Sequence, residues 1–183
     1  MAVQNEWDLK AFASRIGEMD LEAFLRRYPA PFLLVQGVSQ GSGGAFQTGR
    51  VNIAPAAEGD GATSAGPGDA PERLAMLVKS ERNAFRDMIS IGRAGNNDVV
   101  LDHHAVSKLH AFFRARPDGA GWSVTDAGST CGTMLDGLKL PPNKPHPLKT
   151  GQSIIFGNAV WSLYLSPEGL YEHIQSLRFF KKI

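Results

Sequence analysis

The chain has 183 residues, with 19 lysines and arginines against 18 aspartates and glutamates, and its single cysteine is Cys131. A formal net charge of +1 argues against a general nucleic-acid binder, which needs excess basic charge to displace counterions. No apolar run approaches the roughly 20 residues that span a bilayer. The first residues include acids where a signal peptide carries positive charge. We therefore expect a cytoplasmic protein of one domain with appendages, with neither nucleic acid nor membrane as a partner.

Residues 1–30 are predicted to form an N-terminal helical extension. Apolar residues recur at helical spacing, first over 12–19 and then over 21–25. Gly17 separates the two stretches, Asp20 is suited to cap the second helix, and Pro29 ends it. We expect the apolar faces to pack on the neighbouring domain, with binding of a partner protein as the alternative.

Residues 31–53 contain possible first strands, a short buried one at 32–35 and a weak one within 46–53. The next segment, 54–71, contains only Ala, Gly, Pro, Ser, Thr, Asp and Glu. Such a composition cannot bury enough apolar surface to offset the entropy that is lost when the segment becomes ordered. We therefore expect a flexible loop, rich in Gly, Ala and Pro, over 54–71.

Residues 72–166 consist of short β-rich segments separated by turn residues, a pattern typical of an antiparallel β-sandwich or a barrel. In the last segment, Trp161, Leu163 and Leu165 alternate with Ser162 and Tyr164, which predicts a half-buried strand. Residues 167–183 have the spacing of a short C-terminal helix. The fold class predicted is all-β with helices at both ends. The expected strands are 74–79, 88–91, 99–101, 110–114, 122–125, 153–156 and 161–165.

The motifs of common enzyme classes are absent from the sequence. It has no G-x-x-x-x-G-K-[ST] phosphate loop, no G-x-G-x-x-G and no H-E-x-x-H. Lys149-Thr150-Gly151 matches a β-lactamase motif, but its companion S-x-x-K is missing. Histidines 103, 104 and 110 lack the spacing of a metal site, and no base can be assigned to a Cys131 nucleophile. We expect no catalysis, no cofactor and no metal.

Hydrogen-bond donors and positive charge recur on three of the expected loops. Arg93 supplies a planar fork of donors, Lys108 an ammonium group, and Ser107 and Thr130 hydroxyl groups. No acid lies within the 106–111 stretch. This set suits an anion with several acceptor oxygens, such as a phosphate monoester. Because no residue is placed to attack or protonate that anion, we expect binding without turnover.

The motifs around these donors resemble the forkhead-associated (FHA) domain. The resemblance covers about residues 92–157 and consists of five motifs, with a tryptophan-containing strand between the third and the fourth. It depends on the order of the whole set, since no single motif is specific. The motifs are Gly92-Arg93, Asn97-Asp98-Val99-Val100-Leu101, Ser107-x-x-His110, Gly128-Ser129-x-x-Gly132-Thr133 and Leu148-x-x-Gly151-x-x-Ile154-x-Phe156-Gly157.

The resemblance implies a β-sandwich whose loops bind phosphothreonine peptides. The implied partner is a phosphothreonine-containing protein, either a Ser/Thr kinase or a kinase substrate. Arg93 and Ser107 match the phosphate contacts of the family, Lys108 would add a third contact, and Thr130 matches a residue that touches the phosphothreonine. The residues that match those holding the loops in place are Gly92, His110, Gly132 and Thr133.

Cys131 departs from the family pattern, which has an asparagine at this position. An asparagine amide both donates to and accepts from a peptide backbone, whereas a thiol is weak in both roles. Losing this pair of hydrogen bonds would cost about 1 to 2 kcal/mol, or roughly tenfold in affinity. The sequence therefore predicts altered peptide selection. The alternative is an interaction or assembly subunit that binds its partner without phosphate.

Overall fold

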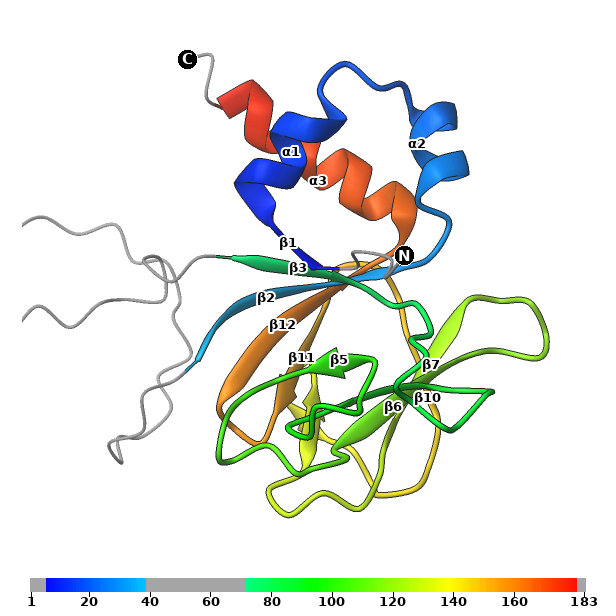
Figure 1. The fold of residues 1–183 in the computed structure, drawn as a ribbon, viewed down its shortest axis with the longest axis vertical. Coiled ribbons are helices and arrows are strands. Elements are labelled where there is room, and N and C mark those ends of the chain that lie inside the picture. Colours follow the sequence, from blue (N-terminus) through cyan, green and yellow to red (C-terminus); the bar gives the residue numbers. More distant parts are fainter. Residues whose placement is uncertain (1–5, 39–71, 181–183) are drawn as a thin grey trace, which may run out of the picture.

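The computed structural model describes residues 6–38 and 72–180 as two β-sheets beneath a layer of helices (Figure 1). The expected weak strand within 46–53 and the expected flexible loop at 54–71 lie outside the described residues. Among these residues, no helix combines the length and hydropathy needed to cross a bilayer.

Seven strands form the larger sheet and five form the smaller one, and every described pairing is antiparallel except that of β4 with β5. The predicted antiparallel β-sandwich with helices at both ends is confirmed. The larger sheet has the order β1 (Glu6–Asp8), β3 (Arg73–Met76), β2 (Phe32–Val38), β12 (Val160–Leu165), β11 (Gln152–Phe156), β8 (Thr133–Leu135), β9 (Leu138–Lys139). The smaller has the order β10 (His146–Pro147), β7 (Trp122–Asp126), β6 (Ala111–Ala115), β4 (Ile89–Gly92), β5 (Val99–Val100).

The main hydrophobic core lies between the two sheets. Leu33 and Ile154 contribute to it from the larger sheet, and Ile91, Phe113 and Val124 from the smaller one, all without exposed surface. Apart from Leu33, these side chains are β-branched or aromatic and fit the pleated surface of a strand that is buried on one face. The sheets thereby hold the loops at their ends on a rigid support.

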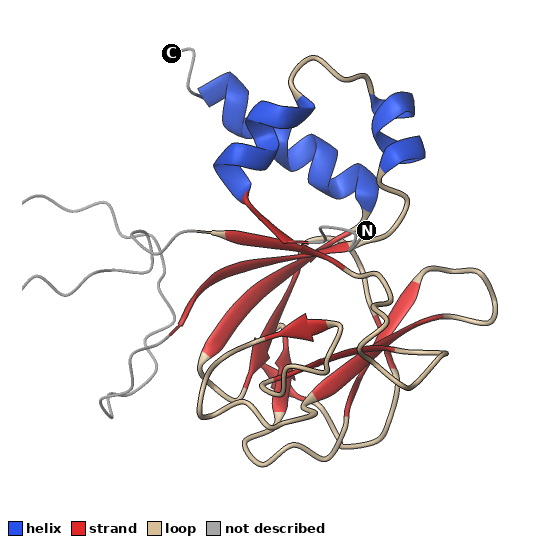
Figure 2. Ribbon diagram, in the orientation of Figure 1, coloured by secondary structure: helices blue, strands red, loops and turns tan. Residues whose placement is uncertain are grey.

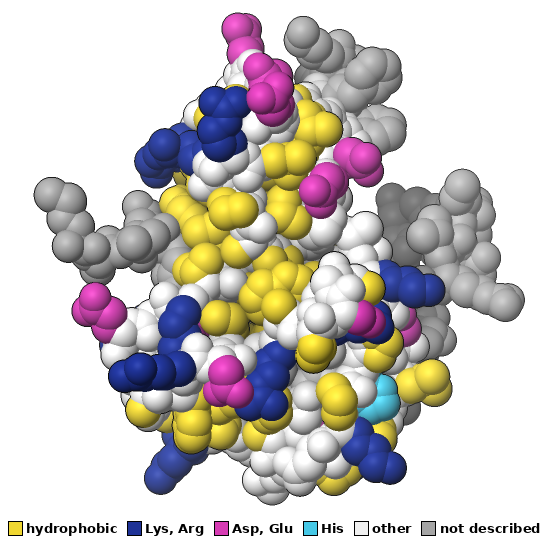
Figure 3. All heavy atoms as spheres, turned by 90° about the vertical axis from the view of Figure 1, so that its right-hand side faces the viewer, with side chains coloured by type: hydrophobic (Ala, Val, Ile, Leu, Met, Phe, Trp, Pro, Cys, Tyr) yellow, Lys and Arg dark blue, Asp and Glu magenta, His cyan; other side chains and the backbone are white. Residues whose placement is uncertain are grey.

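The helices α1 (Leu9–Ile16), α2 (Leu21–Arg27) and α3 (Pro167–Phe180) gather on one side of the sheets (Figure 2). Phe12 and Phe24 form a second core with Phe32 and Leu165 of the sheet and Ile174 of α3. The apolar faces of the N-terminal helices thus pack on the neighbouring domain, as expected. Hydrophobic side chains are also visible on the surface where the helices meet the sandwich (Figure 3).

The first turn of α2 is capped by Asp20, as the sequence predicts. A carboxylate oxygen of Asp20 accepts a hydrogen bond from the backbone N–H of Ala23 at 2.7 Å, as an N-cap residue does. Gly17 ends α1 with a φ of 46°, a conformation that strains residues with a side chain. Asp8 caps α1 in the same way as Asp20 caps α2.

The sequence did not predict four short strands. β1 falls within the segment predicted to be helical, and β8, β9 and β10 fall between the predicted strands. Each has only two or three residues, too few for an alternating pattern to be recognised. Their pairing is set by neighbouring strands, so that Trp7 of β1 pairs with Leu74 of β3.

β12 forms where the alternation predicts a strand, but its more deeply buried face is the one that carries Ser162 and Tyr164. Ser162 and Tyr164 face the main core, whereas Leu163 and Leu165 pack on the helical layer. Trp161, on the same face as Leu163 and Leu165, is 40% exposed. The alternating pattern cannot reveal that helices cover the outer face of the sheet.

Candidate anion-binding site

Three loops meet at the end of the sandwich opposite the helices. Leu165, at the helix-covered end of β12, pairs with Phe32, whereas Gly157 precedes the other end of β12 and donates a backbone hydrogen bond to the Gly132 oxygen at 3.0 Å. The first loop follows β4 and carries Arg93, and the second follows β5 and carries Ser107 and Lys108. The third follows β7 and carries Thr130. This arrangement places the predicted donors far from the helical layer.

The loops after β4 and β5 run side by side. The backbone N–H of Arg93 donates to the Ser107 oxygen at 2.9 Å, and that of Ala94 donates to the Lys108 oxygen at 3.1 Å. A Cβ atom on Gly92 would collide with the Lys108 carbonyl group, so only glycine permits this approach. The Asn97 amide donates to the oxygens of both Ala94 and Lys108, at 2.8 and 2.6 Å, and fixes the spacing of the two loops.

His110 joins the second loop to the third. Its Nδ1 accepts from the backbone N–H of Ser107 at 3.0 Å, and its Nε2 lies 3.1 Å from the Gly132 oxygen. Because Nδ1 accepts, the proton of the neutral ring is on Nε2, which donates to Gly132. Burial lowers the pKa of His110, although the Gly132 hydrogen bond and the charge of Asp126 oppose this shift. The ring is therefore a neutral connection between loops.

The Asp126 carboxylate stabilises the third loop by accepting four hydrogen bonds. One carboxylate oxygen accepts from the backbone N–H groups of Gly128 and Ser129, both at 2.9 Å. The other accepts from the hydroxyl groups of Ser129 and Thr133, both at 2.6 Å. Burial alone would raise the pKa of Asp126, but these hydrogen bonds outweigh burial and hold the pKa below its usual value. An ionised carboxylate thus orders the loop that carries Thr130.

The predicted contact residues meet around a surface hollow, here called the anion hollow. His104 also lines it, and no Asp or Glu is among its lining residues. Ser107 and Thr130 are joined across the hollow, since the Thr130 backbone N–H donates to Ser107 Oγ at 3.1 Å. The predicted residues that line the hollow are Arg93, Ser107, Lys108, Thr130 and Cys131.

The two basic side chains of the anion hollow are available to a ligand. Arg93 and Lys108 are exposed, and within the described part of the chain neither forms an ion pair with an acid. The Nε of Arg93 donates to the Val106 oxygen at 3.2 Å, which orients the guanidinium group. Its two terminal nitrogens have no hydrogen-bond partner among the described residues. An oriented guanidinium, an ammonium and two hydroxyl groups together suit a phosphate oxyanion.

The four residues predicted to support the loops lie behind the hollow and do not line it. His110 and Gly132 join the second and third loops, and Gly92 allows the first two to approach each other. Thr133 donates to Asp126 across the two ends of the third loop. The roles of all nine residues in ligand binding stay predictions. Residues 6–38 and 72–180 contain no group of three or more His, Cys, Asp or Glu side chains that could hold a metal ion.

Sequence reasoning missed three residues that shape the site. Asp126 is one of them, although an aspartate followed by Gly128 and Ser129 is typical of a side chain that caps its own turn. Asn97 was recognised only as a motif residue, because its partners lie on another loop. His104, at the rim of the hollow, has no local signal that distinguishes it from other loop histidines.

These features define a β-sandwich with a cationic hollow that is built from loops at one end. The sequence model of the FHA domain family matches residues 89–157, which include all the predicted site residues. Residues 89–157 therefore match the FHA domain family, and the resemblance found in the sequence is confirmed.

Two relatives with known names match part of the chain. Human kanadaptin is 35% identical over 77 residues, a match that covers 37% of this chain and 10% of kanadaptin. The FHA domain-containing protein FhaB of Mycolicibacterium smegmatis is 37% identical over 73 residues, a match that covers 37% of this chain and 44% of FhaB. The chain thus spans less than half the length of either relative.

Among solved structures, the chain is similar to one from a study of phosphothreonine-dependent FHA domain interactions. The two share 16% sequence identity with a TM-score of 0.42, and the match covers 74% of this chain and 95% of the other.

Proposed function

We propose that this FHA domain is a non-enzymatic module that binds phosphothreonine-containing segments of a partner protein. The observation that carries this proposal is the meeting of Arg93, Ser107, Lys108 and Thr130 around one hollow without an acid. A phosphate monoester carries close to two negative charges at neutral pH and offers three acceptor oxygens. FHA domains belong to the modules that recognise phosphorylated motifs through basic clusters.

Each donor has a distinct part in the proposed complex. The Arg93 fork binds two phosphate oxygens, Lys108 adds a mobile positive charge at the rim, and Ser107 donates its hydroxyl hydrogen. Ser107 Oγ now lies 3.4 Å from Thr130 Oγ1, a weak contact that a phosphate oxygen can replace. Thr130 and Cys131 then face the peptide next to the phosphorylated residue.

Cys131, which stands where the family has an asparagine, bears on which peptides the domain selects. Its side chain lines the anion hollow and is half-buried, so it is in position to touch a bound peptide. The phosphate donors do not depend on this thiol. We therefore expect the cysteine to change which peptides bind, while phosphate recognition is kept.

The partner proposed is a Ser/Thr kinase or a substrate of one, because such kinases produce phosphothreonine. The cytoplasmic location inferred from the sequence stays a prediction. The alternative, an assembly subunit that binds without phosphate, is disfavoured by the unpaired basic side chains of the hollow. Such side chains have no evident use in an interface that excludes an anion.

The test is a titration of an oriented phosphothreonine peptide library and its unphosphorylated counterpart against the wild type and Arg93→Ala. Loss of the guanidinium is expected to cost about 2 to 3 kcal/mol, or about 30- to 150-fold in Kd. Thermal stability should change little, because Arg93 is exposed. Arg26→Ala removes an equally charged, exposed side chain from α2 and should leave binding unchanged. Equal binding of phosphorylated and unphosphorylated peptides would overturn the proposal.

A further inference from the structure

A second hollow lies directly beside the anion hollow. Lys108 and Leu109 line both, so the two hollows are adjacent. The second one, here called the Phe85 hollow, is also lined by Phe85, Ala94 and Asn96. None of these three residues belongs to the motifs that mark the phosphate contacts.

Phe85 is a large apolar side chain in an exposed position. It is 54% exposed and lies in the loop that connects β3 to β4. Its backbone N–H donates to Asn83 Oδ1 at 2.9 Å, and Asn83 is itself buried, with 7% of its surface exposed. The Asn83 amide donates in turn to the Met88 oxygen at 3.3 Å and to the carboxylate of Asp98. A buried network of hydrogen bonds therefore fixes the backbone of the exposed Phe85.

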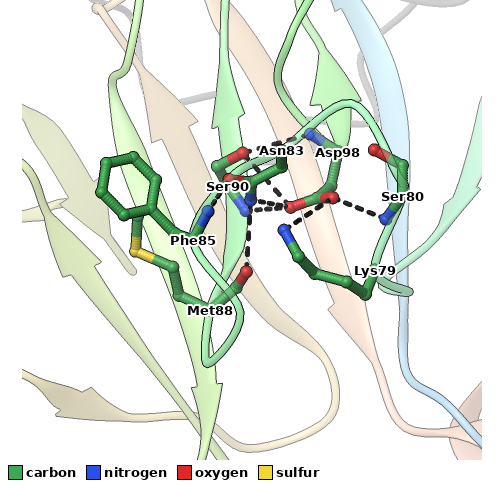
Figure 4. Close-up of polar contacts among 7 residues, drawn as sticks. All are labelled: Lys79, Ser80, Asn83, Phe85, Met88, Ser90 and Asp98. Atoms are coloured by element: carbon green, nitrogen blue, oxygen red, sulfur yellow. Dashed lines mark hydrogen bonds and ion pairs between the residues drawn. The ribbon is translucent and has the colours of Figure 1, made fainter.

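Asp98 lies at the centre of this hydrogen-bond network, and the Phe85 side chain points away from it (Figure 4). The Asp98 carboxylate is completely buried and accepts from the backbone N–H groups of Ser80 and Ser90, both at 2.7 Å. It also pairs with Lys79 at 3.4 Å. These contacts fasten the Phe85 loop to β4, the strand that leads into Arg93. The loop that lines the Phe85 hollow is thus connected to the strand that precedes Arg93 of the anion hollow.

The chemistry of the Phe85 hollow favours an apolar occupant. Its apolar lining consists of Phe85, Ala94 and Leu109, and the stem of a lysine such as Lys108 is also aliphatic. The other lining residues are Asn83, Ser90, Asn96 and Asn97. Three of the four polar lining residues already have partners: Asn97 binds two backbone oxygens, and Asn83 and the Ser90 hydroxyl contact Asp98. A charged occupant would find no unpaired counter-charge there except Lys108, which also serves the anion hollow.

We propose that the Phe85 hollow binds an apolar side chain of the same phosphorylated peptide, a few residues from the phosphothreonine. This inference rests on the proposed function, since the anion hollow next to it, which shares Lys108 and Leu109 with it, identifies the occupant. An extended peptide rises about 3.3 Å per residue, so neighbouring residues of one ligand can reach both hollows. Phe85 is then a specificity-determining residue, and Asp98 positions it through Asn83.

The experiment compares phosphothreonine peptides in which a single leucine is moved through the flanking positions of an alanine-flanked parent. The wild type is expected to prefer leucine at one position by about tenfold over the parent. Phe85→Ala should reduce that preference to less than about twofold while leaving the Kd of the parent unchanged. Phe85→Leu should keep part of the preference, because it preserves an apolar wall. Leu177→Ala, which removes an exposed apolar side chain from α3, should behave as the wild type.

The outcomes separate this inference from the proposed function. Phosphate-dependent binding with no preferred leucine position, or a preference that survives Phe85→Ala, would overturn the inference and leave the proposed function standing. Failure of every phosphothreonine peptide to bind the wild type would remove both.

Discussion

The two ends of the sandwich are stabilised by different means. At the helix-covered end, aromatic rings pack around Phe12, with ring centroids 5.0 Å away in Trp7 and 5.1 Å away in Tyr28. At the loop end, the buried groups are polar: Asp98, Asp126 and His110 each connect segments through hydrogen bonds. One end is held by burial of apolar area and the other by satisfied polar groups.

This difference follows from what each end exposes. Apolar packing stabilises only surfaces that are covered, so it suits the outer face of the larger sheet beneath the helices. A site that must leave donors open to a ligand cannot be covered in this way. Buried carboxylates hold the loop backbones from behind and leave Arg93, Ser107 and Lys108 exposed toward the hollow. The loop end can therefore be rigid and accessible at once.

The largest effect is expected at the helix-covered end. Phe12→Ala removes a completely buried ring and should lower the free energy of unfolding by about 4 kcal/mol, measured by urea denaturation. Phosphopeptide affinity of the folded fraction should not change, because the anion hollow lies at the opposite end of β12. Leu177→Ala, at a 38% exposed position, should cost less than about 1 kcal/mol. A parallel loss of affinity in Phe12→Ala would show that the two ends are coupled.

Replacement of Asp126 tests the polar end. Asp126→Ala leaves four donors without their acceptor and should cost about 3 kcal/mol of stability. It should also weaken phosphopeptide binding, because the Thr130 loop loses its support. Asp126→Asn should lose less, since one oxygen remains for the two backbone N–H groups and the hydroxyl groups can rotate to accept from the amide.

The matched control for Asp126 is Asp87→Ala. Asp87 is exposed and pairs with Arg114 at the surface, so its loss should cost less than about 1 kcal/mol. Equal losses of stability in Asp87→Ala and Asp126→Ala would contradict the role given to the buried carboxylate.

The smallest expected effect is the dependence of stability on pH. His110 has a folded-state pKa below its usual 6.5, because it is buried as the neutral form. Its contribution to stability is complete above about pH 6.5 and is lost as the pH falls toward the folded-state pKa. Urea denaturation should therefore give a lower free energy of unfolding at about pH 5.5 than at about pH 7.5.

Two variants test whether His110 causes this pH dependence of stability. His110→Gln should reduce the difference between the two pH values, whereas His173→Gln, on α3, should retain it. A pH dependence unchanged by His110→Gln would contradict the interpretation of His110 as a neutral connection between loops.

Local sequence patterns predicted the capping of α2 by Asp20, the positions of most longer strands and the order of the loop motifs. Each of these depends on residues that are close in the chain. The convergence of Arg93, Ser107 and Thr130 could be expected only because the family resemblance supplied the topology. Patterns alone left the alternatives of sandwich and barrel open.

The sequence by itself determined which segments extend, where they turn and which of them carry donors for an anion, because periodicity and turn chemistry act over a few residues. Only the tertiary structure decided that helices cover the outer face of β12, and that Asp98 holds the loop of Phe85. Asn83 and Asp98 are 15 residues apart in the chain, and Leu165 meets the N-terminal helices from the far end of the sequence. Contacts of this kind depend on how the sheets close and how the layers stack, which no short window of residues encodes.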